Sequence, residues 1–233
     1  MVLCCETGGR YEIEPVASSV SIALLSSGAG QAVGVIGLCG LIGALGDQML
    51  HVACQRLAQS ALPWDLSVNV APAQLRDAGF PATVLRTLTE TGLSADRLIL
   101  EITESVLAED DDVLSGLYQL REHAIRIAVD DFGTGYSCLA RLDTLRVDFM
   151  KVDKSLLHRA GSSGTAPLVD AAIALAHGLG LRVVVEGVET QQQADYLRDR
   201  GCDSGQGYFW TRPVAWAALP EMPHPAAVAT GVR

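Results

Sequence analysis

The sequence predicts an α/β protein that folds as a TIM-like (β/α)-barrel with parallel strands. Segments of strand and helix character alternate along most of the chain. The expected strands are short, rich in β-branched residues and often apolar on both faces, which is typical of parallel strands covered by helices. About seven such units in 233 residues favour a closed barrel over an open sheet.

The first half of the regular region alternates helices with three expected strands. Residues 47–60 have helical periodicity, with Leu50, Ala53, Cys54 and Leu57 on one face. After this helix, alternating or apolar runs predict strands and periodic segments predict helices. In chain order these are a strand at 65–70, a helix at 81–91, a strand at 97–101, a helix within 105–122 and a strand at 126–130.

The second half repeats the alternation. An apolar helix is expected to end near Gly178 and Gly180, because glycine is favoured just after a helix. The remaining expected elements are strands at 147–152, 181–186 and 207–209, and helices at 165–178, 191–200 and 214–219. We expect three regions: a divergent amino-terminal segment of the barrel (1–39), the barrel core (40–222) and a flexible tail (223–233).

Composition limits the classes of partner. The formal net charge is −10, which argues against binding a nucleic acid polymer, since that requires a basic surface. An anionic substrate would therefore have to be met by metal ions and local Lys or Arg. The six cysteines are scattered without a C-x-x-C pair, and no signal peptide is evident. We therefore expect free thiols and a cytoplasmic location.

The amino-terminal segment has two interpretations. From Pro15 to Gly46 there is no charged residue, and this length could cross a bilayer. Gly30-x-x-x-Gly34 is also a spacing found in membrane helix pairs. However, the segment is rich in Ser, Gly and Ala and has no basic or aromatic anchor near its far end. This composition favours a buried α/β segment over a membrane helix.

A pair of adjacent carboxylates ends one expected strand. Asp130 and Asp131 follow an apolar run and precede a loop that contains Gly133 and Gly135. Because neighbouring strand residues face opposite sides, both can reach one site only if the strand ends there and the glycines allow a sharp turn. Such close carboxylates repel unless a proton or cation lies between them. The alternative is an acidic turn in which Asp131 lies near a helix cap.

Polar residues interrupt successive strands at their carboxyl ends, which share one rim in a barrel. They are Asn69, Glu101, Asp130 with Asp131, Lys151, Glu186 and Gln206. A packed core gains nothing from such groups, because a buried carboxylate is costly unless it is paired or binds a metal. Oxygen ligands without His or Cys favour Mg²⁺ or Mn²⁺.

This donor set suits a two-metal site for attack on a phosphodiester. Asp130 could bridge two ions, with Asp131 on one side and Asn69 and Glu101 on the other. Lys151 could polarise the attacking water or neutralise phosphate, and Glu186 could hold that water or act as general base.

The motifs around these residues resemble, in order and spacing, the EAL-domain family of bacterial cyclic-di-GMP phosphodiesterases. They are Ser67-Val-Asn-Val70, Leu100-Glu-Ile-Thr-Glu-Ser105, Asp130-Asp-Phe-Gly-Thr-Gly-Tyr-Ser137, Lys151-Val-Asp153, Glu186-Gly-Val-Glu-Thr190 and Gln206-Gly-Tyr208. The match covers residues 40–220. It implies a TIM-like barrel that opens cyclic-di-GMP to linear pGpG with Mg²⁺ or Mn²⁺.

The resemblance also implies a role for each matching residue. The implied metal ligands are Asn69, Glu101, Asp130 and Asp131, and the groups around the metals and the nucleophilic water are Lys151, Glu186 and Gln206. The residues implied to support the metal ligands and to anchor the loop are Glu104, Glu189 and Asp153, with Glu104 holding the loop from Phe132 to Ser137. The implied substrate contacts are Phe132, Gly133, Tyr208 and Pro213. The loop after Asp131 resembles one that couples dimerisation to activity, so a homodimer is expected.

The chain departs from the family pattern at its beginning. The Glu-Ala-Leu stretch, whose Glu binds metal in the family, is absent. Counting back without gaps from Gly40 places this motif on Glu14-Pro15-Val16. Glu14 is therefore the expected metal ligand, with Glu12 as second choice, while an ordinary exposed glutamate is the alternative. The phosphate-gripping Arg of the family falls on Ser18.

Two other functions stay open at this stage. The leading hypothesis is the phosphodiesterase, with activity impaired by the altered beginning. The same altered beginning motivates the alternative of a receptor that binds cyclic-di-GMP, or a partner protein, without cutting it. An enolase-like site that abstracts a proton is the third hypothesis. It fits less well, because adjacent Asp130 and Asp131 suit paired metals better.

Overall fold

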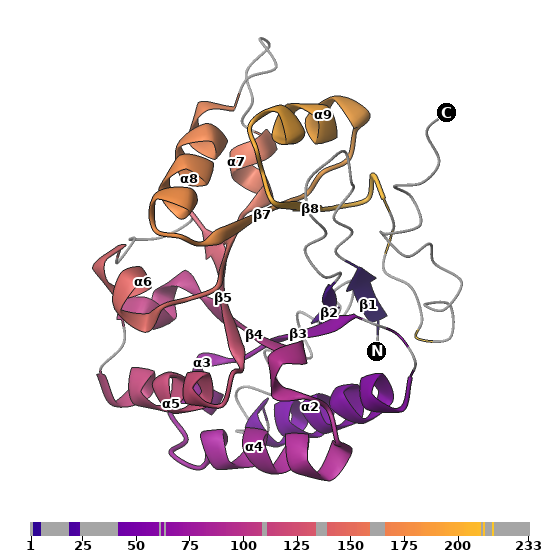
Figure 1. Cartoon of the computed structure of the whole chain (residues 1–233), viewed down its shortest axis with the longest axis vertical. Helices are drawn as coiled ribbons and strands as arrows, with labels where there is room; N and C mark the ends of the chain where they lie inside the picture. Colours follow the sequence, from indigo (N-terminus) through magenta and orange to yellow (C-terminus); the bar gives the residue numbers. More distant parts are fainter. Residues whose placement is uncertain are drawn as a thin grey trace.

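The computed structural model describes residues 2–5, 19–23, 42–60, 62, 64–108, 111–133, 139–158, 166–210, 212 and 216. Its centre is one curled sheet whose eight strands follow chain order, with the helices outside it (Figure 1). The strands are β1 (Val2–Cys5), β2 (Ser19–Ala23), β3 (Asp65–Asn69), β4 (Leu98–Thr103), β5 (Arg126–Phe132), β6 (Phe149–Val152), β7 (Arg182–Glu186) and β8 (Ser204–Gln206).

Strand direction confirms the predicted fold class, with one exception. Every neighbouring pair from β2 to β8 is parallel, whereas β1 is antiparallel to β2. The sheet is therefore a TIM-like barrel of parallel strands with an antiparallel first strand. The prediction did not include this reversed strand.

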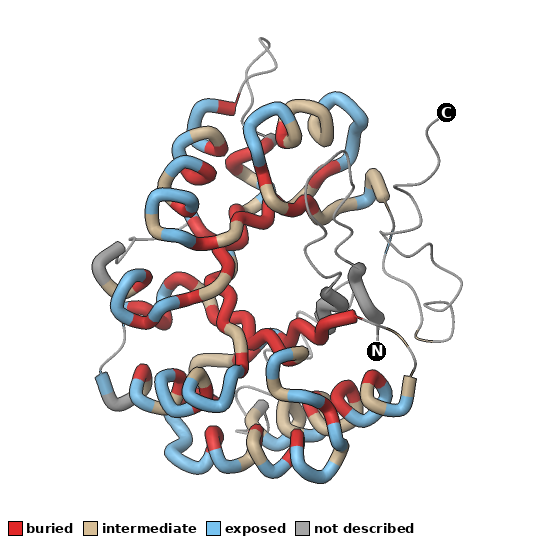
Figure 2. Tube along the Cα trace, viewed as in Figure 1, coloured by how far each residue is buried: buried red, intermediate tan, exposed pale blue. Residues whose placement is uncertain are grey.

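The helices cover the outer face of the sheet. They are α2 (Ile42–Gln59), α3 (Pro72–Leu75), α4 (Phe80–Thr91), α5 (Asp111–Glu122), α6 (Leu139–Leu145), α7 (Lys154–His158), α8 (Pro167–Gly178) and α9 (Gln191–Asp199), with short 3-10 turns η1 (Ala95–Arg97) and η2 (Glu104–Ala108). The predicted apolar face of the first helix is correct, because Leu50, Ala53, Cys54 and Leu57 are all buried. Figure 2 shows this general pattern, with buried strands inside and exposed outer faces of the helices.

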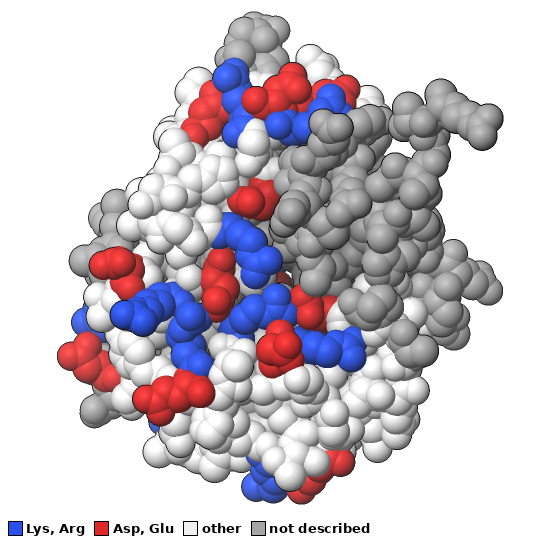
Figure 3. Space-filling model, in the orientation of Figure 1, with Lys and Arg blue, Asp and Glu red and all other residues white. Residues whose placement is uncertain are grey.

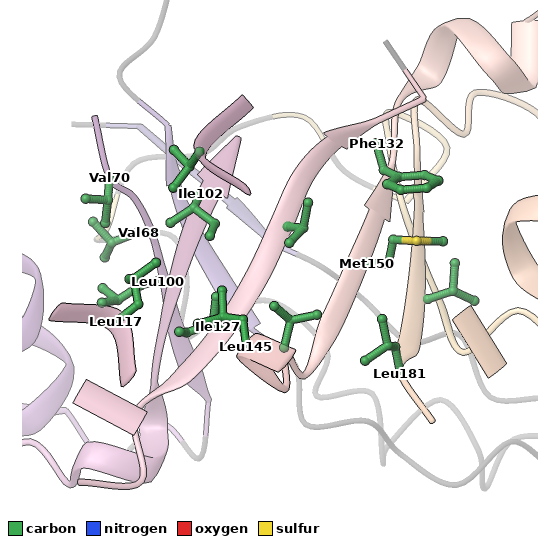
Figure 4. Packing of buried hydrophobic residues seen from close by; sticks show 14 of the residues in the cluster. Val68, Val70, Leu100, Ile102, Leu117, Ile127, Phe132, Leu145, Met150 and Leu181 are labelled. Atoms are coloured by element: carbon green, nitrogen blue, oxygen red, sulfur yellow. The ribbon is translucent and has the colours of Figure 1, made fainter. Parts of the chain in front are cut away.

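Local signals explain several boundaries. α9 begins with a capping box, in which Thr190 accepts a hydrogen bond from the Gln193 N–H and the Gln193 side chain returns to the backbone of Thr190. Gly92, which follows the last residue of α4, caps the helix with a left-handed φ of 74°. Burial of the outward strand side chains against the helices forms the main core, part of which Figure 4 shows from Val68 on β3 to Leu181 next to β7.

The last strand lies earlier than predicted. Ser204–Gln206, and not 207–209, pairs with β7. Gly207 turns away because its backbone lies against Val188, where an added Cβ would be 2.0 Å from the Val188 carbonyl oxygen. The Phe209 N–H then donates to that oxygen at 3.0 Å, which makes the segment after Gly207 a turn. The predicted helix at 214–219 falls, apart from residue 216, outside the described residues.

The segment that could have been a membrane helix is partly described. Residues 19–23 form strand β2, and residues 42–46 begin helix α2. None of the helices in the described part of the chain is long and apolar enough to cross a membrane. Residues 15–18 and 24–41 lie outside the described residues.

Two of the six cysteines are described with their side chains. Cys54 and Cys202 are free and buried. Burial raises the pKa of both thiols to about 12, so both are neutral and unreactive. This agrees with the expectation of free thiols at these two positions.

The interior of the barrel is layered along each strand, because alternate side chains point inward. The lowest layer is charged: Arg126 on β5 pairs with Asp65 on β3 at 2.7 Å, and the Arg182 guanidinium lies 4.2 Å from the ring centre of Phe149. Basic and acidic side chains also intermingle around the middle of the face in Figure 3. The next layer is apolar on four strands and contains Ile99, Ala128, Phe149 and Val184. The layer above it is polar.

Candidate active site

The polar layer lies two residues further along each strand than the apolar one. It contains Glu101 on β4, Asp130 on β5, Lys151 on β6 and Glu186 on β7. Strand pairing also places Asn69 level with Glu101, and Gln206 level with Glu186. The tertiary structure therefore assembles the predicted residues of six successive strands at one rim.

Lys151 is the centre of this rim. Its Nζ lies 3.0 Å from Glu101 Oε2, 3.1 Å from Asp130 Oδ1 and 2.7 Å from Glu186 Oε1. Lys151 is only 3% exposed and Glu101 only 1%, so water screens these ion pairs little. Three carboxylates around one ammonium leave a surplus of negative charge.

Asp130 has the most perturbed carboxyl of the rim. Burial, followed by the smaller effects of the neighbouring Glu101 and Glu186, raises the pKa of its carboxyl to about 6 against the lowering effect of Lys151. A carboxyl in this position is easily protonated or, equally, receptive to an added cation.

Ser67 supports Glu101 from the neighbouring strand. Its Oγ donates a hydrogen bond to Glu101 Oε1, and Ser67 is 1% exposed. Ser67 was not among the residues predicted to be functional. The available signal was its place two residues before Asn69, which puts both side chains on the same face of β3.

The adjacent carboxylates are arranged differently from the prediction. β5 does not end at Asp130 but continues to Phe132 through an irregularity in its pairing with β6. Asp131 itself adopts a left-handed φ of 58°, and its N–H donates to Asp130 Oδ1 at 3.0 Å. The chain therefore already turns at Asp131, before Gly133, and the Asp131 side chain is exposed.

Glu104 contacts the start of the following loop. Its Oε2 accepts a hydrogen bond from the Gly133 N–H at 3.1 Å. Gly133 has a φ of 97°, which favours glycine, and a Cβ there would lie 2.6 Å from Leu156 Cδ1, so a larger residue would also displace the end of the Leu156 side chain. Residues 134–138 of the loop lie outside the described residues.

The residues that were expected to contact substrate fall in different places. Phe132 is buried in the core, so its ring does not face the rim. Gly133 is exposed beside it. Tyr208 is 53% exposed, with the Arg212 guanidinium 4.5 Å from its ring centre. Pro213 and the expected ligand Glu14 lie outside the described residues.

Asp153 and Glu189 have local contacts that suit structural positions. Asp153 Oδ1 accepts the Ser155 N–H at 2.9 Å at the start of α7. Burial tends to raise the pKa of Asp153, but hydrogen bonds from Ser155 and the charge of Lys154 outweigh it and lower the pKa. Glu189 is exposed, and its N–H donates to Gln193 Oε1 at 2.8 Å within the cap of α9. That they support the metal ligands stays a prediction.

The chemistry of the rim fits a hard divalent cation, although its geometry is centred on Lys151. Among the described residues, no three His, Cys, Asp or Glu side chains form a group that could hold a metal ion by themselves. Even so, the excess of carboxylate over ammonium charge and the all-oxygen donors of Asn69, Glu101 and Asp130 are what Mg²⁺ or Mn²⁺ requires.

One position of the rim has no polar residue. Ile22 of β2 pairs with Val68, so the next residue, Ala23, lies level with Asn69. The five described residues of β2 include no Asp or Glu. β1 ends at Cys5, which pairs with Val20 near the start of β2.

Comparison with known proteins identifies the family. A protein-family model described as EAL domain matches residues 5–213, which includes most of the predicted divergent segment. NbdA of Pseudomonas aeruginosa, described as a cyclic di-GMP phosphodiesterase, is 38% identical over 195 residues, which are 81% of this chain and 25% of NbdA. The chain spans about a fifth of the length of other curated relatives that it matches.

Solved structures agree. The PaMucR phosphodiesterase in complex with c-di-GMP superposes with a TM-score of 0.82 at 30% identity, covering 93% of each chain. Klebsiella pneumoniae BlrP1, described as a manganese and cyclic-diGMP complex, shares the fold at 24% identity, with a TM-score of 0.75 over 91% of this chain and 55% of that one. With its rim of carboxylates around a buried lysine and these matches, the chain belongs to the EAL domain family.

Proposed function

We propose that this chain hydrolyses cyclic-di-GMP to linear pGpG in a reaction that depends on Mg²⁺ or Mn²⁺. The observation that carries the proposal is the buried Lys151 among Glu101, Asp130 and Glu186, at the rim where a barrel places its active site. The descriptions of NbdA and PaMucR support the substrate class. The oxygen donors of the rim support the choice of metal.

Each group has a chemical task in this proposal. Asn69, Glu101, Asp130 and Asp131 would hold the metal ions, which supply Lewis-acid stabilisation of the phosphoryl oxygens and a more acidic water. Lys151 carries the positive charge that balances the developing charge on phosphate. Glu186, which is less buried than Glu101, accepts a proton from the attacking water. Gln206 lies level with Glu186 and can orient the same water.

The direct test measures pGpG by chromatography after incubation with cyclic-di-GMP and Mn²⁺ or Mg²⁺. The expected result is metal-dependent formation of pGpG, which Glu186→Gln abolishes. The matched control, Gln192→Ala, changes an exposed side chain on α9 and should retain full activity. Absence of pGpG at high protein concentration, with the protein folded, would refute hydrolysis.

A receptor that binds cyclic-di-GMP without cutting it is the second candidate. The favouring observation is β2, which places Ala23 level with Asn69 and contributes no acidic residue within its described range. Glu14 stays the proposed substitute ligand, outside the described residues. Calorimetry that shows binding of cyclic-di-GMP without pGpG formation would assign the chain to this class.

We also propose a homodimer formed through the loop after Asp131, in a cytoplasmic protein. The support is the fixed start of that loop, where Glu104 holds the Gly133 N–H. Light scattering during size-exclusion chromatography tests the dimer, since a monomeric mass at high concentration contradicts it.

A further inference from the structure

The hydrogen bond between Ser67 and Glu101 joins two adjacent layers of the barrel interior. Ser67 pairs in register with Ile99, one layer below Glu101, yet its hydroxyl reaches up to Glu101 Oε1. Its counterparts on β4 to β7 in the same layer are the apolar residues Ile99, Ala128, Phe149 and Val184. A hydroxyl in this layer therefore has a specific partner in the layer above it.

The bond fixes the orientation of a buried carboxylate. Glu101 Oε1 receives the Ser67 hydroxyl, and Glu101 Oε2 lies 3.0 Å from Lys151 Nζ. Ser67, on β3, contacts one oxygen of the Glu101 carboxylate, and Lys151, on β6, contacts the other. Two other strands therefore hold the carboxylate of β4. A glutamate side chain has several rotamers, and holding one of them in advance lowers the cost of binding an ion there.

We propose that Ser67 is a positioning residue for Glu101, which presents that carboxylate to a divalent cation at the rim. This inference rests on the proposed metal-dependent function. Ser67 contacts neither substrate nor metal in this role, and it acts only through Glu101. Without its hydroxyl, Glu101 samples other orientations, and a buried oxygen loses a charge-assisted hydrogen bond.

The structure offers a matched control on the opposite side of the rim. Ser204 lies on β8, two residues before Gln206, as Ser67 lies two residues before Asn69. Both serines are buried, at 8% and 1% exposed. Ser67 donates to a rim carboxylate, that of Glu101. The strand of Ser204, β8, has no carboxylate among its three residues, so Ser204 has no such partner on its own strand.

The experiment titrates Mn²⁺ into the full chain by calorimetry, without substrate, and compares Ser67→Ala, Ser67→Thr and Ser204→Ala with the parent. We expect Ser67→Ala to weaken Mn²⁺ binding by about 10-fold to 100-fold, as for loss of a hydrogen bond to a charged group. Ser67→Thr keeps the hydroxyl and should restore most of the affinity. Ser204→Ala should bind as the parent does. Thermal melting of each variant confirms that it is folded.

Hydrolysis provides a separate measurement. If the parent forms pGpG, Ser67→Ala should lower kcat and leave KM for cyclic-di-GMP within about twofold, because Ser67 acts on the reacting end of the site. If the parent binds Mn²⁺ but forms no pGpG, the proposed hydrolysis fails while the calorimetric comparison still decides the role of Ser67. Equal Mn²⁺ affinity of Ser67→Ala and the parent would overturn the inference, as would a parent that binds no Mn²⁺.

Discussion

Replacing Lys151 by methionine tests the electrostatics of the rim most directly. The substitution keeps an unbranched side chain, one atom shorter than that of lysine, and removes its charge. The ammonium lies 3.0 Å from Glu101, 3.1 Å from Asp130 and 2.7 Å from Glu186, and it is 3% exposed. Its loss leaves three partly or fully buried carboxylates without this countercharge. Breaking a buried pair by removing one partner costs about 3–5 kcal/mol.

The loss of stability should depend on pH. Lys151 lowers the pKa of Asp130, so the variant has a still higher Asp130 pKa in the folded state. A carboxyl whose pKa in the folded state is above its unfolded pKa of 3.8 destabilises the fold once it is ionised. The free energy of unfolding therefore falls as the pH rises through the folded-state pKa. The cost of Lys151→Met should therefore be full at pH 8 and smaller at pH 5, where Asp130 can take up a proton.

Urea unfolding at pH 5 and pH 8 measures this difference. Lys154→Met is the control, because Lys154 is an exposed lysine at the start of α7 in the same part of the chain. We expect that control to change the unfolding free energy by less than about 0.5 kcal/mol at either pH. An equal loss at both pH values for Lys151→Met, or a loss below about 1 kcal/mol at pH 8, would refute the electrostatic argument.

Three further predictions concern neighbouring positions. Asp130→Asn should raise the unfolding free energy at pH 8 by about 1–3 kcal/mol, because ionised Asp130, with a pKa of about 6, disfavours the fold. The same variant should lose pGpG formation. A lower urea midpoint than the parent's would contradict the stability argument. Gly133→Ala should lower the free energy of unfolding by about 1–3 kcal/mol, since it combines a left-handed φ with a steric clash. Gly178→Ala, whose added Cβ meets no atom within 4 Å in α8, should instead raise it by about 0.5–1 kcal/mol in the same urea experiment. Ala23→Glu should tighten Mn²⁺ binding measured by calorimetry, because it adds a carboxylate level with the rim. If Glu14→Gln leaves Mn²⁺ binding unchanged while Ala23→Glu tightens it, the missing metal ligand belongs on β2 and not at Glu14.

The sequence by itself determined which polar residues lie at the rim. Asn69, Glu101, Asp130, Lys151 and Glu186 could be identified because each interrupts an apolar strand near its carboxyl end, and parallel strands bring these ends together. The same alternation predicted the buried face of α2 and the fold class. These features depend on local periodicity, which a single sequence contains in full.

The tertiary structure decided how these groups contact one another. The Ser67 contact with Glu101 joins residues on two strands, and the central place of Lys151 depends on three strands at once. The turn at Asp131 depends on its pairing irregularity with β6, and the end of β8 depends on the close approach of Gly207 to Val188. Such features are set by distances between segments far apart in the chain, and the pattern along any one segment does not contain that information.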